Sequence, residues 1–231
     1  MFFGKDRQPF PRLKILSFLF AFFCKEWYTV VNPKRERKGT QMEILVVVDM
    51  QNDFIDGALG TKEARSILPR VVERVRAFPG RVLYTRDTHE PDYLESQEGR
   101  NLPVPHCIRG TAGWALHPQI EALRKEQPID KPTFGSVGLG QVLQAANREQ
   151  PISSVTLVGL CTDICVISNA LLLKAFLPEV KIAVDASCCA GVTPESHLQA
   201  LEAMKVCQIH IENDPADSSI LSDAHASGET L

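Results

Sequence analysis

Short, almost wholly apolar runs alternate with segments of helical periodicity along most of this chain. Two such runs, Glu43–Asp49 (EILVVVD) and Arg81–Arg86 (RVLYTR), are rich in residues that favour strands. Helical periodicity lies between them over Pro69–Phe78, and Pro69 suits a first helical position. Strands that are apolar throughout and alternate with helices form a parallel sheet covered on both faces. The sequence therefore predicts an α/β fold with three layers, α/β/α, and a doubly wound, mainly parallel sheet of about six strands.

The other expected elements continue this alternation. We expect a short strand that ends at Lys131, further strands over Val155–Gly159, Val180–Asp185 and Cys207–Glu212, and helices over His117–Lys125, Gly138–Asn147, Asp163–Ala175 and Pro194–Lys205. The segment Asp87–Gly113 has little periodicity and many Pro, Gly and His residues. A long segment of this kind inside a domain is usually functional or disordered.

The first 41 residues differ from the rest of the chain. They hold nine of the 25 Lys and Arg residues but only three of the 28 Asp and Glu residues. Their apolar run, residues 13–24, is too short to span a bilayer, and no small-residue cleavage site follows it. A secretory signal and an interfacial membrane anchor are less favoured than an extension outside the fold, because a strand begins just after Met42. The prediction is a single domain over residues 42–213, preceded by an extension (1–41) and followed by a polar, disordered tail (214–231).

Charge and cysteine content restrict the partners and the compartment. Residues 42–231 carry a formal charge of −9, which excludes the basic surface that nucleic acid requires. The seven cysteines form no CxxC pair, so a structural zinc site is not expected. Without a credible export signal, reduced thiols in the cytoplasm are the simplest interpretation.

Chemistry-bearing residues gather where the predicted strands end, which is the edge at which open α/β sheets bind ligands. They are Asp49, Asp87 with His89, Lys131, and the segment that leads to Cys165. A helix N-terminus and a nearby ammonium would favour the Cys165 thiolate, and Asp49 could accept its proton. The alternatives without a functional role are a buried small residue for Cys165, a capping residue for Asp49 and a solvated surface residue for Lys131. No Walker loop or GxGxxG fingerprint follows a strand, so nucleotide binding is not supported.

A metal site is the expectation for Asp87, His89 and His106. A strand end fixes the first two, and a proline-flanked segment carries His106. Two imidazoles and one carboxylate suit Zn, Fe or Mn and leave coordination positions open. The alternative is a set of capping groups and a surface histidine. The other histidines, His117, His197, His210 and His225, are expected at the surface or in caps.

Four ordered motifs resemble those of the nicotinamidase/isochorismatase-like cysteine hydrolases. They read VDMQNDF from Val48, TRDTH from Thr85 with PHC from Pro105, KPTFGS from Lys131, and GLCTDICV from Gly159. The similarity covers about residues 43–212. It implies the isochorismatase-like hydrolase fold and places the chain in the nicotinamidase-like branch, whose metal motifs contain Asp87, His89 and His106.

The resemblance also implies a catalytic triad of Asp49, Lys131 and Cys165. A cis peptide between Leu160 and Cys161 is implied, with the backbone N–H groups of Cys161 and Cys165 as the oxyanion hole. Glu98 is the implied fourth metal ligand, with Glu95 or a water as alternatives. A divalent ion, most simply Zn, would orient the pyridine ring of nicotinamide, and the product nicotinate would enter NAD salvage.

Substrate contacts depart from the family pattern. Pro103 stands where nicotinamidases usually have an aromatic residue, and Thr88 replaces another. Phe54 remains as one wall of the site, with Tyr93 and Phe134 as further candidates.

Three functions therefore stay open. The first is a metal-dependent amidase acting on a small carboxamide, most simply nicotinamide. The second is a metal-free relative acting on another amide, a carbamoyl compound or isochorismate, and the third is a non-catalytic binding protein. A homo-oligomer is expected, and membrane association of residues 1–41 is not favoured.

Overall fold

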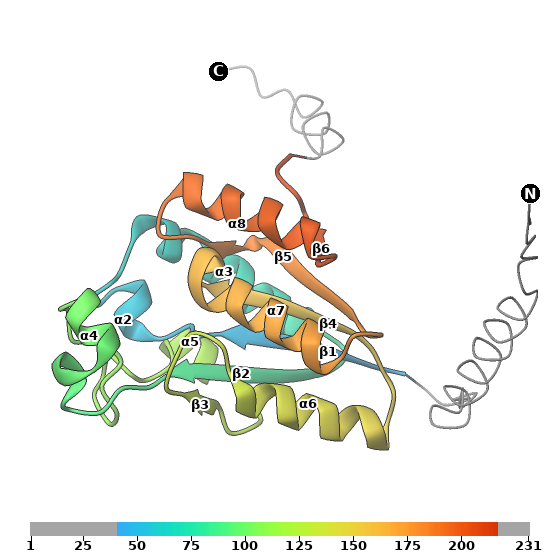
Figure 1. Ribbon diagram of the computed structural model, residues 1–231, viewed down its shortest axis with the longest axis horizontal. Helices are drawn as coiled ribbons and strands as arrows, with labels where there is room; N and C mark the ends of the chain where they lie inside the picture. The colour runs from blue at the N-terminus through green and yellow to red at the C-terminus, as the bar shows by residue number, and fades with distance from the viewer. Residues whose placement is uncertain (1–40, 217–231) are drawn as a thin grey trace, which may run out of the picture. The chain divides into compact units, whose positions relative to one another are not determined.

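The computed structural model describes residues 41–216 and contains one six-stranded sheet in which every neighbouring pair of strands is parallel (Figure 1). The strand order is β3-β2-β1-β4-β5-β6. The strands are β1 (Met42–Val48), β2 (Arg81–Asp87), β3 (Ile129–Lys131), β4 (Ile152–Leu160), β5 (Lys181–Ala190) and β6 (His210–Glu212). The predicted parallel sheet is confirmed. The predictions for residues 1–40 and for 217–231 lie outside the described residues.

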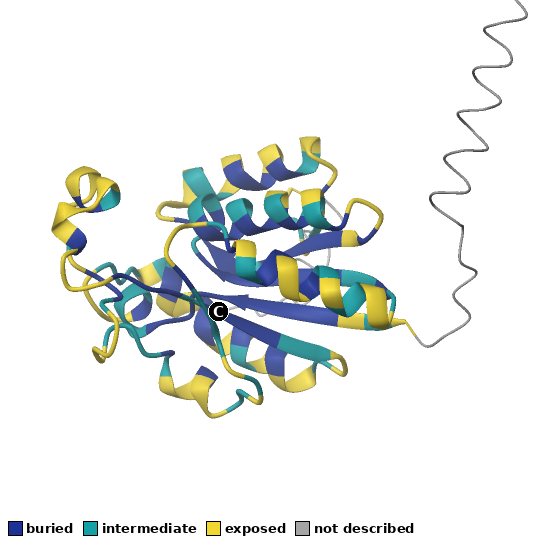
Figure 2. Ribbon diagram, turned by 60° about the horizontal axis from the view of Figure 1, so that its bottom comes forward, coloured by how far each residue is buried: buried dark blue, intermediate teal, exposed yellow. Residues whose placement is uncertain are grey.

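Helices cover both faces of the sheet, and alternate side chains of β1 show how. Ile44, Val46 and Val48 belong to one core, which they share with α6 (Val137–Glu149), α7 (Ile167–Phe176) and α8 (Pro194–Val206). Leu45 and Val47 belong to the other, with α2 (Asn52–Ile55), α3 (Lys62–Ala77) and α5 (Pro118–Glu121). All five side chains are fully buried, and the central strands are buried along most of their length (Figure 2). The sheet is doubly wound, as predicted.

Helix α3 begins earlier than predicted, and the expectation of Pro69 at its first position is wrong. Thr61 caps the helix by accepting the N–H of Ala64, so Pro69 lies in the interior. A proline there costs about 3 kcal/mol. Four buried side chains outweigh this cost at about 1.5–3 kcal/mol each; they are Ile67, Leu68, Val71 and Val75.

The segment between β2 and β3 is mostly irregular, as expected. It contains a 3₁₀ turn (Tyr93–Glu95), α4 (Gln97–Asn101) and the single turn α5, which is shorter than the predicted helix. A π-helical turn, Thr162–Val166, precedes α7. Within residues 41–216, no helix is both long and apolar enough to cross a membrane.

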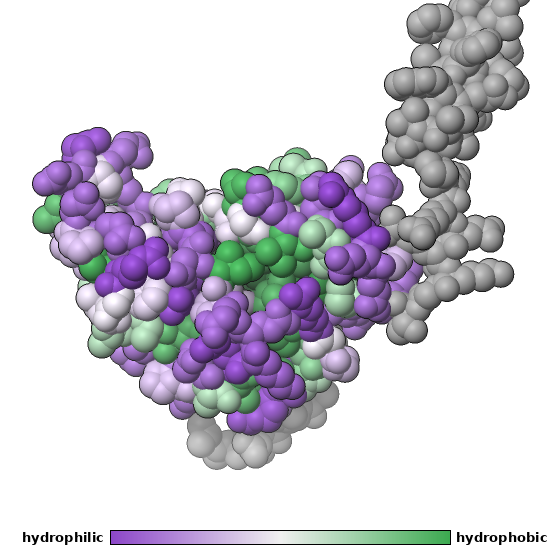
Figure 3. Space-filling model, turned by 90° about the horizontal axis from the view of Figure 1, so that it is seen from below, coloured by the Kyte–Doolittle hydropathy of each residue, from purple (hydrophilic) through white to green (hydrophobic). Residues whose placement is uncertain are grey.

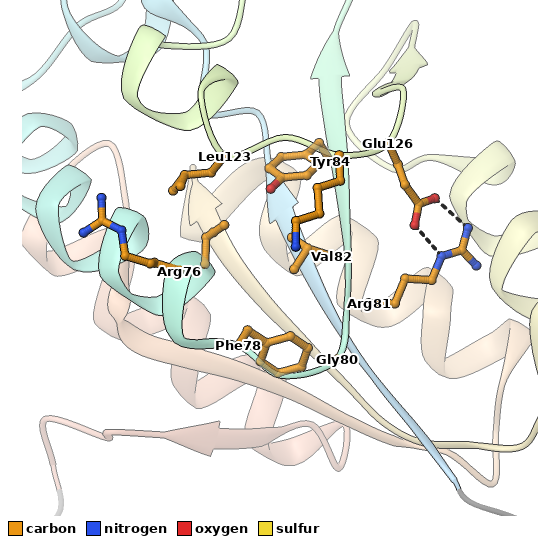
Figure 4. A pocket seen from close by; sticks show the side chains of 10 residues that line it. Arg76, Phe78, Gly80, Arg81, Val82, Tyr84, Leu123 and Glu126 are labelled. Atoms are coloured by element: carbon orange, nitrogen blue, oxygen red, sulfur yellow. Dashed lines mark hydrogen bonds and ion pairs between the residues drawn. The ribbon is translucent and has the colours of Figure 1, made fainter.

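The face seen in Figure 3 is largely hydrophilic, with an apolar area near its centre flanked by hydrophilic residues. Large apolar side chains exposed on α6 and α7 are Val137, Val142 and Leu171. A separate cavity of about 310 Å³ opens beside the start of β2. Phe78, Val82 and Tyr84 line it, and the Arg81–Glu126 ion pair lies at its side (Figure 4). It lies near the amino end of β2, away from the edge that carries Asp87.

Candidate active site

Three strand ends bring Asp49, Lys131 and Cys165 together. Asp49 follows β1, Lys131 ends β3, and Cys165 lies in the π-helical turn after β4. Lys131 Nζ lies 2.7 Å from Asp49 Oδ2 and 3.4 Å from Cys165 Sγ. All three residues are at most 5% exposed. The predicted cluster of acid, amine and thiol is therefore present at the carboxyl edge of the sheet.

Local contacts fix the Asp49 carboxylate. Its backbone has a φ of 49°, which an Asp tolerates better than most residues and which turns the chain sharply after β1. The Thr85 hydroxyl on β2 donates to Asp49 Oδ1 at 2.7 Å. One carboxylate oxygen thus faces Thr85 and the other faces Lys131.

Burial and neighbouring charges together set the protonation of the three groups. It raises the pKa of Asp49, against the Lys131 charge and the Thr85 hydrogen bond. Burial opposes the charge of Lys131, but Asp49, Cys165 and Asp87 together raise its pKa above the ordinary value. The pKa of Cys165 is raised by burial and by Asp49, with Lys131 opposing. Burial thus opposes the thiolate that Lys131 favours, and the thiol must pass its proton to a base before it can attack.

The nucleophile turn is held by a residue that sequence reasoning missed. Asn169 is fully buried on α7, and its Nδ2 donates to the carbonyl oxygens of Cys165 (2.8 Å) and Phe134 (3.0 Å). Its Oδ1 accepts the N–H of Ser136 at 2.9 Å. Asn169 thus joins the thiol turn to the segment after Lys131. The available signal was one amide inside a mostly apolar helix.

The peptide between Leu160 and Cys161 is cis, as the resemblance implied. The turn that follows closes on the Cys161 carbonyl, which accepts the N–H groups of Ile164 (3.1 Å) and Val166 (3.0 Å). Cys161 and Cys165 are therefore joined through one compact turn.

Four side chains form the second cluster on this edge. One ligand atom from each of Asp87, His89, Glu98 and His106 lies within 4.8 Å of the others. His89 Nε2 is buried and lies 2.9 Å from Asp87 Oδ2, but makes no hydrogen bond. His106 Nδ1 is hydrogen-bonded to the Val104 carbonyl at 2.8 Å, which leaves Nε2 for another partner.

This donor set fits a borderline divalent metal. Two imidazole nitrogens and two carboxylates are typical ligands of Zn, Fe and Mn, and the unsatisfied nitrogen of His89 is what an ion would complete. Glu98 belongs to the cluster, whereas Glu95 is exposed and lies outside it. The structure therefore favours Glu98 over Glu95 as the fourth ligand.

One residue belongs to both clusters. Asp87 Oδ1 lies 3.2 Å from Lys131 Nζ, while its Oδ2 faces the two histidines. Asp87 thus joins the triad to the metal-type cluster, an arrangement that the spacing of the sequence motifs did not predict.

Two side chains near β1 hold the long segment that supplies His106. Gln51 accepts the N–H of Asp87 at 2.7 Å and donates to the carbonyls of Asp87 and Trp114. Asp53 Oδ2 accepts the N–H of Cys107 at 2.7 Å. Both residues lie in the VDMQNDF motif, and their anchoring contacts were not foreseen.

The three aromatic residues expected at the substrate differ in position. Phe54 lies 5.6 Å from the His106 ring, between centroids, and is half-buried. Phe134 is 41% exposed. Tyr93 is 2% exposed, contacts both histidine rings, and donates its hydroxyl to the Leu102 carbonyl at 2.9 Å. Tyr93 thus supports the two histidines, and its contact with substrate stays a prediction.

The remaining histidines differ in how well they match the expectation of surface or capping positions. His117 caps α5 and His210 is exposed, as expected, and His225 lies outside the described residues. His197 is half-buried and bonded to Thr162, so the expectation of a surface or capping group is wrong for it.

Comparison with known proteins agrees with this geometry. Residues 43–213 match the model of the isochorismatase domain. The chain belongs to the isochorismatase family. The family and the relatives described next identify the chain as a hydrolase.

Its relatives include the nicotinamidase/pyrazinamidase of Mycobacterium tuberculosis, 27% identical over 190 residues, which are 74% of this chain and 98% of that protein. Among solved structures, the nicotinamidase/pyrazinamidase of Bacillus subtilis is 29% identical with a TM-score of 0.65, over 75% of this chain and 100% of that one. The pyrazinamidase of Pyrococcus horikoshii, solved in complex with zinc, is 28% identical with a TM-score of 0.61, over 74% of this chain and 98% of that one.

Proposed function

We propose that this protein is a metal-dependent amidase that hydrolyses a small carboxamide, with nicotinamide as the first substrate to test. The observation that carries the proposal is the contact of Lys131 with both Asp49 and Cys165, next to the cluster of metal-type ligands. The named relatives, which are nicotinamidases or pyrazinamidases, support the same substrate class.

The proposed reaction begins with proton transfer. Asp49, whose pKa burial raises, accepts the Cys165 proton while Lys131 stabilises the ionised groups. The Cys165 sulfur attacks the carboxamide carbon, and the backbone N–H groups of Cys161 and Cys165 stabilise the oxyanion. The C–N bond then breaks, Asp49 returns the proton to the departing ammonia, and water hydrolyses the thioester to give the carboxylic acid and free thiol.

The proposed metal residues are Asp87, His89, Glu98 and His106, with Zn favoured and Fe or Mn as alternatives. When bound, the ion would supply a Lewis-acid site that orients the substrate. Phe54 is the proposed aromatic contact of the substrate, with Tyr93 and Phe134 as further candidates. A cytoplasmic location and a homo-oligomer also stay predictions; the location is supported by the cysteines within residues 41–216, all six of which are free.

One departure from the family pattern leaves two candidates for the substrate. Pro103 replaces the usual aromatic residue, so a carbamoyl compound or another amide is the second candidate. The test is ammonia release across a panel that includes nicotinamide, pyrazinamide, benzamide and an N-carbamoyl amino acid. Cys165→Ala serves as the control for background hydrolysis. Release from nicotinamide supports the first candidate, release only from the carbamoyl compound supports the second, and release from none contradicts the amidase.

A further inference from the structure

The turn between Cys161 and Cys165 has a side-chain partner on α8. Thr162 Oγ1 lies 2.8 Å from Nδ1 of His197, and Thr162 is fully buried. The neighbouring Asp163 carboxylate accepts the N–H of Val192 at 3.1 and 3.2 Å. Helix α8 packs against this turn (Figure 1). Of two adjacent residues of the turn, Thr162 is therefore bonded to α8 itself and Asp163 to the connection between β5 and α8.

The first turn of α8 holds His197 in a fixed position. Thr193 and Ser196 form a reciprocal capping box at the start of α8, and the His197 N–H donates to the Thr193 carbonyl at 3.0 Å. Gly191 packs so closely that a Cβ there would come within 2.8 Å of the His197 nitrogen. The imidazole is thus carried by a capped first turn packed against the end of β5.

The two contacts, Thr162 with His197 and Asp163 with Val192, have different consequences for the turn. Asp163 fastens the backbone of the β5–α8 connection and keeps α8 near the turn without His197. Thr162 is the residue directly after Cys161, whose N–H is proposed to stabilise the oxyanion. Because burial lowers the pKa of His197, its bond to Thr162 joins two uncharged groups near neutral pH.

We propose that His197 is a positioning residue that, through Thr162, holds the Cys161 peptide where its N–H meets the developing oxyanion. This inference rests on the proposed hydrolase function. A donor of this kind stabilises the transition state only when it is aimed at the position that the charge will occupy. His197 itself does not touch the reacting atoms.

The test measures kcat and KM for the panel substrate with the highest wild-type turnover. We expect kcat to fall about 10- to 100-fold in His197→Ala and Thr162→Val, less than the loss of a whole oxyanion donor. KM should stay within about twofold, because substrate binding precedes charge development. His197→Asn, which keeps a polar atom near the Nδ1 position, should recover much of kcat.

Ser196→Ala is the matched control. It breaks the capping box on the same helix turn but keeps the imidazole of His197 and its partner Thr162, so the unfolding midpoint should fall while kcat falls much less than in His197→Ala. The double variant His197→Ala/Thr162→Val should be no slower than either single variant, because both remove one interaction.

Several outcomes would overturn the inference. An unchanged kcat in folded His197→Ala and Thr162→Val removes the positioning role, as do fully additive losses in the double variant. A kcat loss in Ser196→Ala as large as that in His197→Ala would reduce the role to helix stability. A wild type that hydrolyses no member of the panel would instead overturn the proposed function, and the inference with it.

Discussion

The triad and the metal-type cluster share one edge of the sheet but are built differently. Asp49, Lys131 and Cys165 each follow or end a separate strand, so the parallel strand register brings them to one edge, and Asn169 holds the turn that carries Cys165. In the other cluster only Asp87 and His89 depend on a strand end. Glu98 and His106 come from the irregular segment that Asp53 and its neighbours hold in place. The strands of the sheet position the triad. The loop residues of the other cluster depend on hydrogen bonds to side chains such as Asp53 and on the metal ion that they would bind.

The largest expected effect tests the triad. Cys165→Ala should lower turnover by at least about 10³-fold, because the thioester cannot form. The unfolding midpoint should change little, since alanine fits the space of a small buried side chain. Retention of more than about 1% of activity would exclude Cys165 as the nucleophile. Cys161→Ala is the control and should be mild, because that residue is proposed to act through its backbone N–H.

The next effect tests the cluster itself. Protein purified without chelator should carry close to one equivalent of a divalent transition metal, and His89→Ala and His106→Ala should lose it. Metal analysis measures the content, and re-addition of Zn, Fe or Mn to the stripped wild type should restore turnover. A metal-free wild type whose turnover ignores both chelator and added ions would favour the metal-free alternative.

A smaller effect separates the anchors from the ligands. Asp53→Asn weakens the bond to the Cys107 N–H, so the approach of His106 should loosen. Metal affinity, measured by competition with a chelating dye, should fall about 10-fold or more, as for changes in outer-shell partners. Glu90→Gln is the control, because Glu90 is exposed and its carboxylate forms an ion pair with Arg109, whereas the Cys107 N–H donates to Asp53. Equal affinities in the two variants would show that the loop needs no anchor at Asp53.

A finer test uses the pH dependence of the triad. Asp49 must be ionised to accept a proton, so kcat/KM should fall as the pH drops through its raised pKa. Thr85→Val removes a hydrogen bond that lowers this pKa, so the acid limb should move to higher pH. The profile is measured at saturating metal, with bound metal determined at each pH so that ligand protonation is not mistaken for Asp49. An unmoved limb would exclude Asp49 as the group that sets it.

The smallest expected effect concerns both clusters at once. A chain that begins at Met42 should fold cooperatively and keep full turnover, because every residue of the two clusters lies after it. Thermal unfolding and ammonia release measure this. A lower midpoint or lost turnover would mean that residues 1–41 contribute to the domain.

The sequence by itself determined the parallel sheet, the order of its main elements along the chain and every member of the two clusters except Glu98. Continuous apolar runs report burial on both faces, and strand ends mark the edge where ligands bind, so Asp49, Asp87, Lys131 and Cys165 could be named from pattern alone. The start of α3 escaped prediction because Pro69 is a strong local signal, whereas the apolar stripe that overrides it acts through tertiary packing.

Only the tertiary structure decided how the clusters are held and charged. Burial sets the pKa of Cys165, and burial is a property of the whole fold that no helix-terminus argument supplies. Asn169, Asp53 and His197 make bonds across 33, 54 and 35 positions of sequence, distances at which local pattern carries no information. The residues that do the proposed chemistry follow strand ends, but those that position them are chosen by contacts that exist only after folding.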